Sequence, residues 1–341
     1  MHQLRKLLLP FSWVYALVLR IRHFLYDSGI LKSYIPHQKT IVVGNLSLGG
    51  TGKTPMVNYL IGLYDEDSTA ILSRGYGRET KGTLEVKTNM SVKESGDEPL
   101  LIKKNNPNTL VLVDESRSRG LEYLRANHPE INTVILDDAM QHRKVKANLN
   151  IVLTTFDIPF FSDFLLPAGD LRDIKSRAYA ADLIVVTKTP LRATEIEKKR
   201  IESDLLKYDK PVFFTSVKYG DICDLKGRLM KPDLNRKAAV LTGIANPKYF
   251  IHQVATRFKI AKHFDYRDHH QFTLANIKEL SNFIDTFEAE KPIVLTTEKD
   301  AQRLGIFQNY LLENGIELYF WKIETDFGED TDRFKKLITS I

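Results

Sequence analysis

Short runs of apolar residues alternate with longer polar or helix-like stretches along most of the chain. The runs are rich in Val, Ile and Leu and lie at residues 40–43, 69–72, 109–113, 133–136, 150–153, 182–187, 211–215, 238–242 and 292–296. Each run has the length of a buried strand, and most of the intervening stretches are long enough for a helix. The alternation therefore predicts an α/β fold with a largely parallel sheet, in which functional loops follow the carboxyl ends of the strands.

The pattern is interrupted near residues 219–233, where Gly220, Gly227 and Pro232 lie among several charged residues. Such a composition favours a linker between domains. The length of 341 residues also argues for two domains, because a domain usually has ~100 to 200 residues. We therefore expect an N-terminal segment over residues 1–35, a larger α/β domain over residues 36–220 and a smaller α/β domain over residues 221–341.

The N-terminal segment has a pattern of its own. Thirteen residues from Leu7 to Leu19 are apolar apart from Pro10 and Ser12, whereas a helix that crosses a bilayer needs ~20. From Val14 onward apolar residues recur at helical spacing. This apolar stripe consists of Val14, Leu17, Val18, Ile21, Phe24 and Leu25, and the basic residues Arg20, Arg22 and His23 fall largely outside it.

The stripe predicts an amphipathic basic helix that lies in an anionic membrane surface. Trp13 and Tyr15 support this prediction, because their side chains favour the level of the lipid headgroups. Two alternatives stay open. The helix would otherwise pack on its own domain, or the segment would be a signal peptide, although no small-residue cleavage site follows the apolar run.

Composition and charge narrow the class of protein. Apolar residues make up 43% and charged residues 27% of the chain, which is typical of a folded protein. The net charge is +6, but residues 1–39 hold six Lys and Arg against one Asp, so the remainder is almost neutral. A nucleic-acid-binding domain would spread basic residues over its surface, and we expect no nucleic-acid partner. Cys223 is the single cysteine, which excludes an internal disulfide and a cysteine-based metal cluster.

The run at residues 40–43 leads into a glycine-rich segment, residues 44–55, and a helical pattern follows. A strand, such a loop and a helix in this order form a phosphate-binding loop, whose backbone N–H groups hold phosphates. Lys53 would neutralise phosphate charge, and the Thr54 hydroxyl would coordinate Mg²⁺. The expected nucleotide-binding residues are Ser47, Leu48, Gly49, Gly50, Thr51, Gly52, Lys53 and Thr54, with Ser47 where the general pattern has glycine.

Two acidic pairs accompany the loop. Asp137 and Asp138 end the run at residues 133–136, where phosphate-loop proteins carry an acidic residue that holds Mg²⁺ directly or through water. A helix cap or a solvated turn is the alternative for this pair. Asp97 and Glu98 precede another apolar stretch, and from the residues alone they equally suit a helix start, where the helix dipole stabilises negative charge.

Together these motifs resemble the tetraacyldisaccharide 4'-kinase family of lipid A biosynthesis in Gram-negative bacteria. The similar blocks are residues 44–55, 73–78, 96–99, 137–142, 165–172, 242–247, 268–269 and 296–301. Their order and spacing extend over most of the chain, and the phosphate loop departs from the general pattern in the same way as in the family. Ala139 is a departure, because the family usually has glycine there.

The resemblance implies a P-loop NTPase-like kinase. It would use ATP and Mg²⁺ to phosphorylate the 4'-hydroxyl of an acylated glucosamine disaccharide 1-phosphate, giving lipid IV-A. This substrate is embedded in the membrane, which implies a peripheral protein on the cytoplasmic face of the bacterial inner membrane, with the basic helix on the inner leaflet. The smaller domain would close over the active site, and no obligate protein partner is inferred.

The resemblance also implies roles for single residues. Asp97 matches the general base of the family and Glu98 a metal partner, and His269 would pair with Asp97 across the domain cleft, with His270 as the alternative. The expected catalytic residues are thus Asp97, His269 and Lys53, and the expected metal ligands are Thr54, Glu98, Asp137 and Asp138. Candidate substrate-binding residues are Arg74, Arg78, Arg117, Gln141, His142 and Arg172. Arginine binds phosphate oxygens in a bidentate manner, and a surface salt bridge is the alternative for each arginine.

Other phosphate-loop proteins fit the sequence less well. Partition ATPases carry a lysine immediately before the glycine pair, where this chain has Leu48. GTPases usually show Asn-Lys-x-Asp after a late strand, and residues 186–190 lack both Asn and Asp. A membrane-docking module without enzymatic activity would account for the N-terminal helix but not for the phosphate loop with paired carboxylates.

Overall fold

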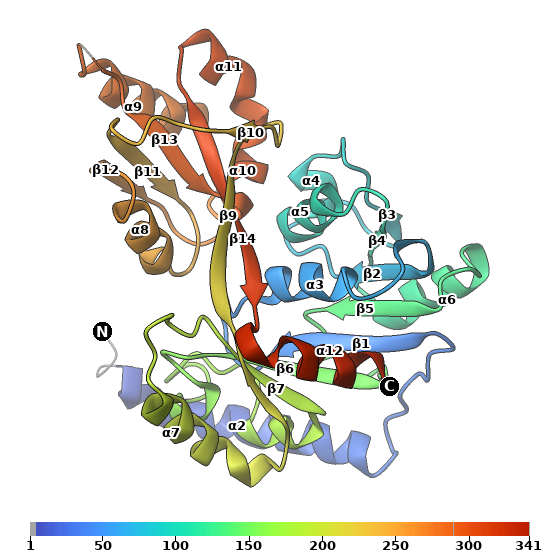
Figure 1. Cartoon of the computed structure of the whole chain (residues 1–341). Helices are drawn as coiled ribbons and strands as arrows, with labels where there is room; N and C mark the ends of the chain where they lie inside the picture. Colours follow the sequence, from blue (N-terminus) through green and yellow to red (C-terminus); the bar gives the residue numbers. More distant parts are fainter. Residues whose placement is uncertain (1–4, 289, 341) are drawn as a thin grey trace. The chain divides into compact units, whose positions relative to one another are not determined.

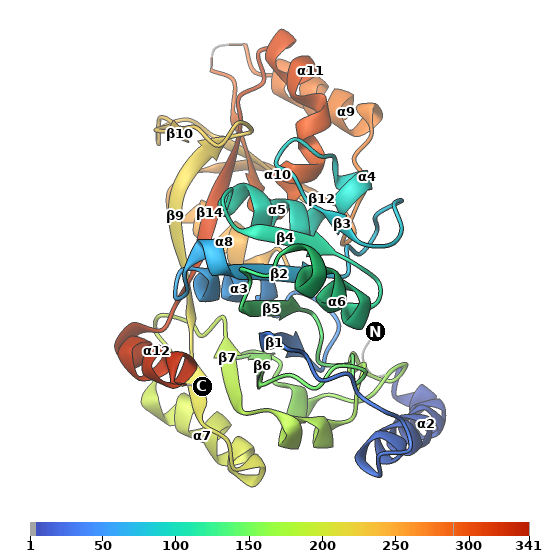
Figure 2. The same cartoon turned by 90° about the vertical axis from the view of Figure 1, so that its right-hand side faces the viewer.

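The computed structural model describes residues 5–288 and 290–340. They form two compact units, and each contains a β-sheet flanked by helices (Figures 1 and 2). The first unit runs up to Lys218 and resumes at Thr325, and the second unit is Tyr219–Glu324. The predicted α/β fold with largely parallel sheets is confirmed.

The first unit contains an eight-stranded sheet in the order β3-β4-β2-β5-β1-β6-β7-β8. The strands are β1 (Lys39–Asn45), β2 (Thr69–Ser73), β3 (Leu84–Glu85), β4 (Leu110–Val113), β5 (Thr133–Asp137), β6 (Leu149–Thr155), β7 (Leu183–Thr187) and β8 (Val212–Phe214). All neighbours pair in parallel except the short edge strand β3, which is antiparallel to β4. The functional loops therefore emerge at one edge of the sheet, after β1, β2, β4, β5, β6 and β7.

Two hydrophobic cores cover the two faces of this sheet. Successive side chains of a strand point to opposite faces, so Ile41 and Val43 of β1 enter one core and Val42 enters the other. Helices pack on both faces, as a parallel sheet requires. They are α2 (Leu9–Asp27), α3 (Lys53–Ile61), α4 (Val92–Ser95), α5 (Asp97–Asn105), α6 (Arg117–Asn127), α7 (Glu195–Leu205) and α12 (Thr331–Thr339).

The second unit contains a six-stranded sheet in the order β10-β9-β14-β13-β11-β12. Its strands are β9 (Ser216–Asp224), β10 (Leu229–Met230), β11 (Ala238–Thr242), β12 (Ile260–Asp265), β13 (Ile293–Thr297) and β14 (Leu318–Asp326), and its helices are α8 (Lys248–Ala255), α9 (Leu274–Asp285), α10 (Glu298–Leu304) and α11 (Gln308–Glu313). Strand β11 pairs in parallel with both β12 and β13. The predicted strands at residues 238–242 and 292–296 correspond to β11 and β13.

We expected the smaller domain to extend over residues 221–341, but the end of the chain belongs to the larger, first unit. From Thr325 onward the chain is part of the first unit. Phe327, Phe334 and Ile338 are buried in the same core as Ile41 and Val43. The second unit is thus inserted into the first, and β9 and β14 contain the two boundaries. Part of the expected linker, residues 219–233, is therefore strand β9.

Helix α2 is attached to the first unit by the face opposite to the apolar stripe. Ser12, Leu19 and His23 are buried, whereas Val14, Leu17, Val18, Ile21 and Phe24 are each more than half exposed. The Ser12 hydroxyl donates to the Leu165 carbonyl at 2.8 Å, and His23 Nε2 lies 2.7 Å from Asp173 Oδ1. The helix therefore packs on its own unit, as the alternative expected, but it does so with the face opposite to the apolar stripe, which stays largely exposed.

The N-terminal helix is also longer than the thirteen-residue run suggested. The helical segment Lys6–Asp27 is long and apolar enough to cross a membrane by length and composition. Its inner face nevertheless donates hydrogen bonds to the first unit: Tyr15 to the Arg172 carbonyl at 2.9 Å and Arg22 to the Gln141 carbonyl at 2.8 Å. Lipid cannot surround a helix that keeps these bonds. The observed arrangement therefore suits a helix that lies on the surface of the first unit better than one that crosses a membrane.

The position of α12 leads to a prediction about stability. Phe334 is fully buried and stacks on Phe327 with ring centroids 3.9 Å apart, and its ring also meets the edge of Phe213. We expect Phe334→Ala to lower the free energy of unfolding of the first unit by about 3 to 5 kcal/mol, because it opens a cavity in the core. Urea unfolding measures this loss, and Lys335→Ala on the exposed side of α12 is the control. Equal stability of both variants would contradict the assignment of α12 to this core.

Candidate functional site

The glycine-rich loop between β1 and α3 depends on backbone conformations that favour glycine. Gly49 and Gly52 have φ values of 90° and 84°, a region in which a Cβ atom clashes with the backbone. Gly44 is required for a different reason, because a Cβ atom there would lie 2.5 Å from the Cβ of Met140. Gly44 lies within β1, so the end of this strand, from which the loop starts, is directly against the segment that follows β5.

Neighbouring segments hold the loop in place. The Leu48 N–H donates to the Asp170 carbonyl at 2.7 Å, and the Arg172 N–H donates to the Leu46 carbonyl at 2.8 Å. On the other side, the Thr187 hydroxyl at the end of β7 donates to the Thr51 carbonyl at 2.8 Å. These bonds fix the loop before any ligand binds, which reduces the entropic cost of binding.

Asp137 ends β5 as a fully buried carboxylate. The Ser73 hydroxyl donates to its Oδ2 at 3.0 Å, whereas Oδ1 accepts no hydrogen bond from the described residues. Burial and the charges of Glu98 and Asp138 raise the pKa of Asp137 to about 7. A buried carboxylate oxygen without a donor suits a cation as its partner.

Asp138 has cationic neighbours instead. Arg172 donates to both carboxylate oxygens of Asp138 and also to Asn45 Oδ1, and Lys53 Nζ lies 3.7 Å from Asp138 Oδ1. Burial alone would raise the pKa of Asp138, but the hydrogen bond from Arg172 and the charge of Lys53 lower it to about 2. Asp138 is thus ionised at neutral pH, and Arg172 contacts a carboxylate of the site.

The second acidic pair opens α5. Gly96, with a φ of 89°, precedes the helix, and Asp97 is buried at its first position. Asp97 Oδ1 accepts the N–H of Glu98 at 3.0 Å. Because the charge of Glu98 acts on Asp137, the fold brings this pair towards the end of β5, and the expectation of a helix start is also met.

The predicted metal ligands lie in the first unit. No group of three or more His, Cys, Asp and Glu side chains among residues 5–288 and 290–340 is arranged to hold a metal alone. Mg²⁺ usually binds through one or two carboxylates together with phosphate oxygens and water. The residues present therefore fit a Mg²⁺ ion that binds together with a nucleotide. Asp137 Oδ1, which accepts no hydrogen bond from the described residues, is a protein oxygen that could coordinate this ion.

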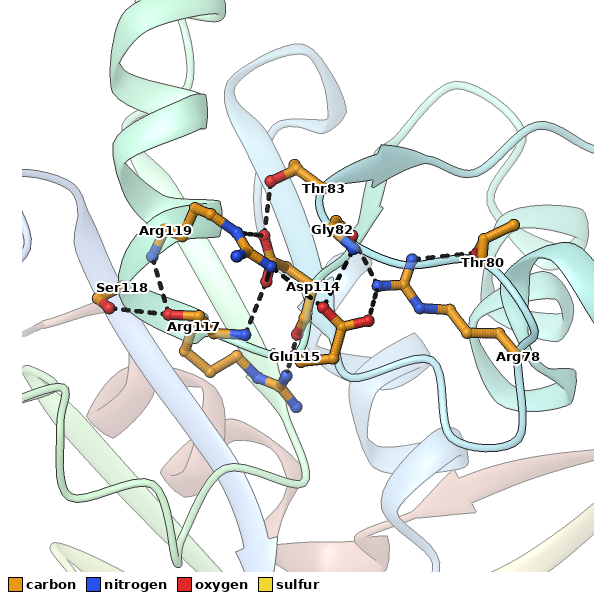
Figure 3. Close-up of polar contacts among 10 residues, drawn as sticks. Arg78, Thr80, Gly82, Thr83, Asp114, Glu115, Arg117, Ser118 and Arg119 are labelled. Carbon is orange, nitrogen blue, oxygen red and sulfur yellow. Dashed lines mark hydrogen bonds and ion pairs between the residues drawn. The ribbon is translucent and has the colours of Figure 1, made fainter.

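Arg78 is engaged with acidic and backbone groups rather than directed at a ligand (Figure 3). Its Nη2 donates to Glu115 Oε1 at 2.5 Å and to the Gly82 carbonyl at 2.6 Å. Arg119, which the sequence analysis did not select, forms a bidentate pair with Asp114 and reaches Glu115. Arg78 thus forms a salt bridge, although with a buried rather than a surface side chain, and its predicted contact with substrate stays a prediction.

Arg117 joins the ends of two strands. Its guanidinium donates to the Asp114 carbonyl at 2.7 Å and to the Asp137 carbonyl at 3.0 Å. Burial lowers the pKa of Arg117 to about 10, so it stays protonated at neutral pH. Arg117 therefore helps to position Asp137 through the backbone carbonyl of that residue. The contact of Arg117 with substrate stays a prediction.

The other candidates for substrate binding surround the same strand ends. Arg74 follows β2 and is exposed. Gln141 Nε2 donates to the Asn45 carbonyl at 2.7 Å. Burial and the charges of Arg117 and Arg74 lower the pKa of His142 to about 4, which makes it neutral at physiological pH. Asn45, which the sequence analysis did not select, accepts hydrogen bonds from both Gln141 and Arg172. Its position as the last residue of β1 is the sequence feature that could have identified it as a site residue.

The two candidate histidines lie in the second unit. His269 has a φ of 55°, and its Nε2 lies 3.2 Å from Lys299 Nζ. His270 stacks on Tyr266 with centroids 4.5 Å apart and bonds Asn276 Oδ1 at 3.1 Å. Both histidines therefore have partners within their own unit, and the pairing of His269, or of His270 as the alternative, with Asp97 stays a prediction.

Comparisons with known proteins agree with the resemblance. The model of the tetraacyldisaccharide-1-P 4'-kinase family (LpxK) matches residues 4–341. The tetraacyldisaccharide 4'-kinase of Flavobacterium psychrophilum is 38% identical over 99% of this chain and 97% of its own, and that of Porphyromonas gingivalis is 37% identical over 94% and 91%. A crystal structure of LpxK from Aquifex aeolicus in complex with ATP is 30% identical, covers 99% of both chains and has a TM-score of 0.77.

The contact between Gly44 and Met140 predicts the effect of a single methyl group. Gly44→Ala would place a Cβ atom 2.5 Å from the Cβ of Met140, and we expect a loss of about 1 to 3 kcal/mol in the free energy of unfolding from overpacking. Gly62→Ala, directly after the C-terminal end of α3, is the control, because its Cβ would meet only the Tyr59 carbonyl at 3.6 Å. Urea unfolding of both variants tests this, and a stable Gly44→Ala variant would contradict the tight contact.

Proposed function

Because the chain belongs to the tetraacyldisaccharide 4'-kinase family, we propose that it transfers the γ-phosphoryl group of ATP to the 4'-hydroxyl of an acylated glucosamine disaccharide 1-phosphate, which yields lipid IV-A. The observation that carries this proposal is the arrangement at the end of β5. Lys53 of the phosphate loop lies 3.7 Å from Asp138, beside the buried Asp137 with its available oxygen. These are the groups that phosphoryl transfer needs for positioning and charge neutralisation.

The phosphate loop would bind the β- and γ-phosphates. Backbone N–H groups of residues 47–54 and the ammonium of Lys53 supply the positive potential. Thr54, Asp137 and Asp138 would hold Mg²⁺, with Glu98 as a further ligand, and a bound Mg²⁺ would neutralise charge on the two phosphates. Arg172 restrains Asp138 in this role through its bidentate contact.

Asp97 would act as the general base. It is buried at the start of α5, where backbone N–H groups stabilise the carboxylate. In the transfer step a carboxylate oxygen of Asp97 accepts the proton of the 4'-hydroxyl, while the hydroxyl oxygen forms its bond to the γ-phosphorus and the bond to ADP breaks. Arg74, Gln141 and His142 would contact the sugar.

Helix α2 would place this site at the membrane. The apolar stripe is exposed while the opposite face of the helix is hydrogen-bonded to the unit, which leaves the stripe available for lipid. The exposed Lys6 and Arg20 would add attraction to anionic headgroups, whereas Arg5 is paired with Asp170. This arrangement supports a peripheral location on the cytoplasmic face of the inner membrane, where the acylated acceptor is held.

The activity is tested by incubating the purified protein with ATP, Mg²⁺ and the acylated disaccharide 1-phosphate in mixed micelles. We expect a product with one additional phosphate, detected by mass spectrometry of the lipid fraction. Lys53→Ala is the control, because it removes the ammonium group of the phosphate loop, and Lys53 belongs to neither hydrophobic core of the first unit. A folded wild-type protein that hydrolyses ATP but leaves the lipid unchanged would overturn the proposal.

The role of Asp97 predicts a specific kinetic change. Asp97→Ala should lower kcat by ~10² to 10⁴-fold and change the Kd for ATP little, because a base acts chiefly in the transition state. Asp67→Ala, at an exposed carboxylate after α3, should match the wild type. Steady-state kinetics and calorimetry measure both quantities. If Asp97→Ala loses ATP affinity and keeps kcat at saturation, Asp97 is a binding residue instead.

Membrane attachment by α2 is best tested with point substitutions, since deleting the helix would also remove its bonds to Arg172 and Gln141. The double variant Val14→Ser/Val18→Ser should reduce partition onto anionic vesicles at high salt by about tenfold or more, at ~0.8 kcal/mol per buried CH₂. Ile196→Ser, at an exposed apolar side chain of α7, is the control. ATP affinity should stay the same in both. Unchanged vesicle binding of the double variant would place the membrane contact elsewhere.

A further inference from the structure

Lys188 follows β7 in an unusual backbone conformation. Its φ is 57°, in the left-handed region that side chains other than glycine rarely adopt. Flanking hydrogen bonds hold this turn: the Thr189 N–H donates to the Thr215 carbonyl at 2.9 Å, and the Thr189 hydroxyl donates to the Val186 carbonyl at 3.3 Å. Strain that the surroundings maintain in this way is concentrated at functional sites.

The turn brings the Lys188 side chain to the phosphate loop. A methyl group placed on Gly50 would lie 3.8 Å from Lys188 Nζ. The preceding residue, Thr187, is itself bonded to the Thr51 carbonyl at 2.8 Å, so the end of β7 and the loop form one rigid contact. The ammonium group therefore lies beside the glycine pair of the loop, although residues 186–190 lack the Asn and Asp of a guanine-binding motif.

The strand order indicates which end of a nucleotide meets this ammonium. In the sheet, β5 lies on one side of β1, and β6 and then β7 lie on the other. Asp137 is the last residue of β5, and Asp138, which follows it, is close to Lys53. The γ-phosphate and its metal belong on that side, since the phosphate-loop lysine and the strand-end acid act there. The opposite side, where β7 ends, is left for the α-phosphate and the ribose.

We propose that Lys188 binds the α-phosphate and ribose end of the nucleotide, which rests on the proposed use of ATP. A lysine ammonium has three donors, and a nucleotide presents phosphate and ribose oxygens as acceptors at this end. Burial lowers the pKa of Lys188 and the charge of Asp157 opposes that effect. A desolvated cation of this kind gains more from a phosphate than a solvated one does.

The test uses Lys188→Gly in the full chain, because glycine removes the side chain and adopts the positive φ without strain. Calorimetry in Mg²⁺ buffer measures the Kd for ATP and for ADP. We expect both affinities to fall by the same factor, about 10- to 100-fold, because both nucleotides carry the α-phosphate and the ribose. The kcat at saturating ATP should stay near the wild-type value, and Lys188→Arg should recover part of the affinity.

Other outcomes overturn the inference. Unchanged affinities would show that Lys188 does not bind the nucleotide, and a loss confined to ATP with a lower kcat would place it at the γ-phosphate. A loss that accompanies a lower unfolding temperature and that Lys188→Arg does not recover would make Lys188 a structural residue. Lys198→Ala, at a lysine of α7 paired with Glu195, is the control. A wild-type chain that binds neither nucleotide would refute the proposed function itself, whereas wild-type binding with an unaffected variant would refute only the role of Lys188.

Discussion

Two adjacent carboxylates at the buried end of a central strand must be compensated, and much of the first unit is arranged to do so. Asp137 is the last residue of β5 and Asp138 follows it directly, so each carboxylate disfavours the ionised form of the other. The two carboxylates have different surroundings. Asp138 is paired with Arg172 and lies near Lys53, whereas Oδ1 of Asp137 is buried and accepts no hydrogen bond from the described residues. Arg172 also connects three parts of the unit. Its guanidinium donates to Asn45 at the end of β1, and its carbonyl accepts the hydroxyl of Tyr15 from helix α2.

Most of the first sheet could be predicted because its strands are buried on both faces. Such strands appear in the sequence as continuous apolar runs, and the runs at residues 40–43 and 133–136 became β1 and β5. Strands β9 and β14 escaped prediction because most residues of β9 and the second half of β14 are not fully buried, and because Gly220 interrupts the first of them. That α12 packs on the first unit was not predicted for another reason. The sequence around Phe334 does not indicate which of the two units this side chain packs into.

The same distinction applies to the candidate site. The phosphate loop is a local motif, so its glycines and its place between β1 and α3 followed from spacing. The partners of long side chains are decided by distant segments, and the pairing of Arg78 with Glu115 or of Arg172 with Asp138 could not be read from spacing. Periodicity predicted the apolar stripe of α2 but could not say that Ser12 and His23, rather than the stripe, would face the unit.

The return of the C-terminal segment has a consequence for biosynthesis. The first unit contains both the earliest and the latest parts of the chain, whereas the second unit is one continuous stretch between them. On the ribosome, at ~5 to 20 residues per second, the core around Ile41 and Met56 is complete only after Phe334 and Ile338 have emerged. Nascent chains released early would therefore expose this apolar surface, and the first unit would need chaperones that bind apolar segments for longest.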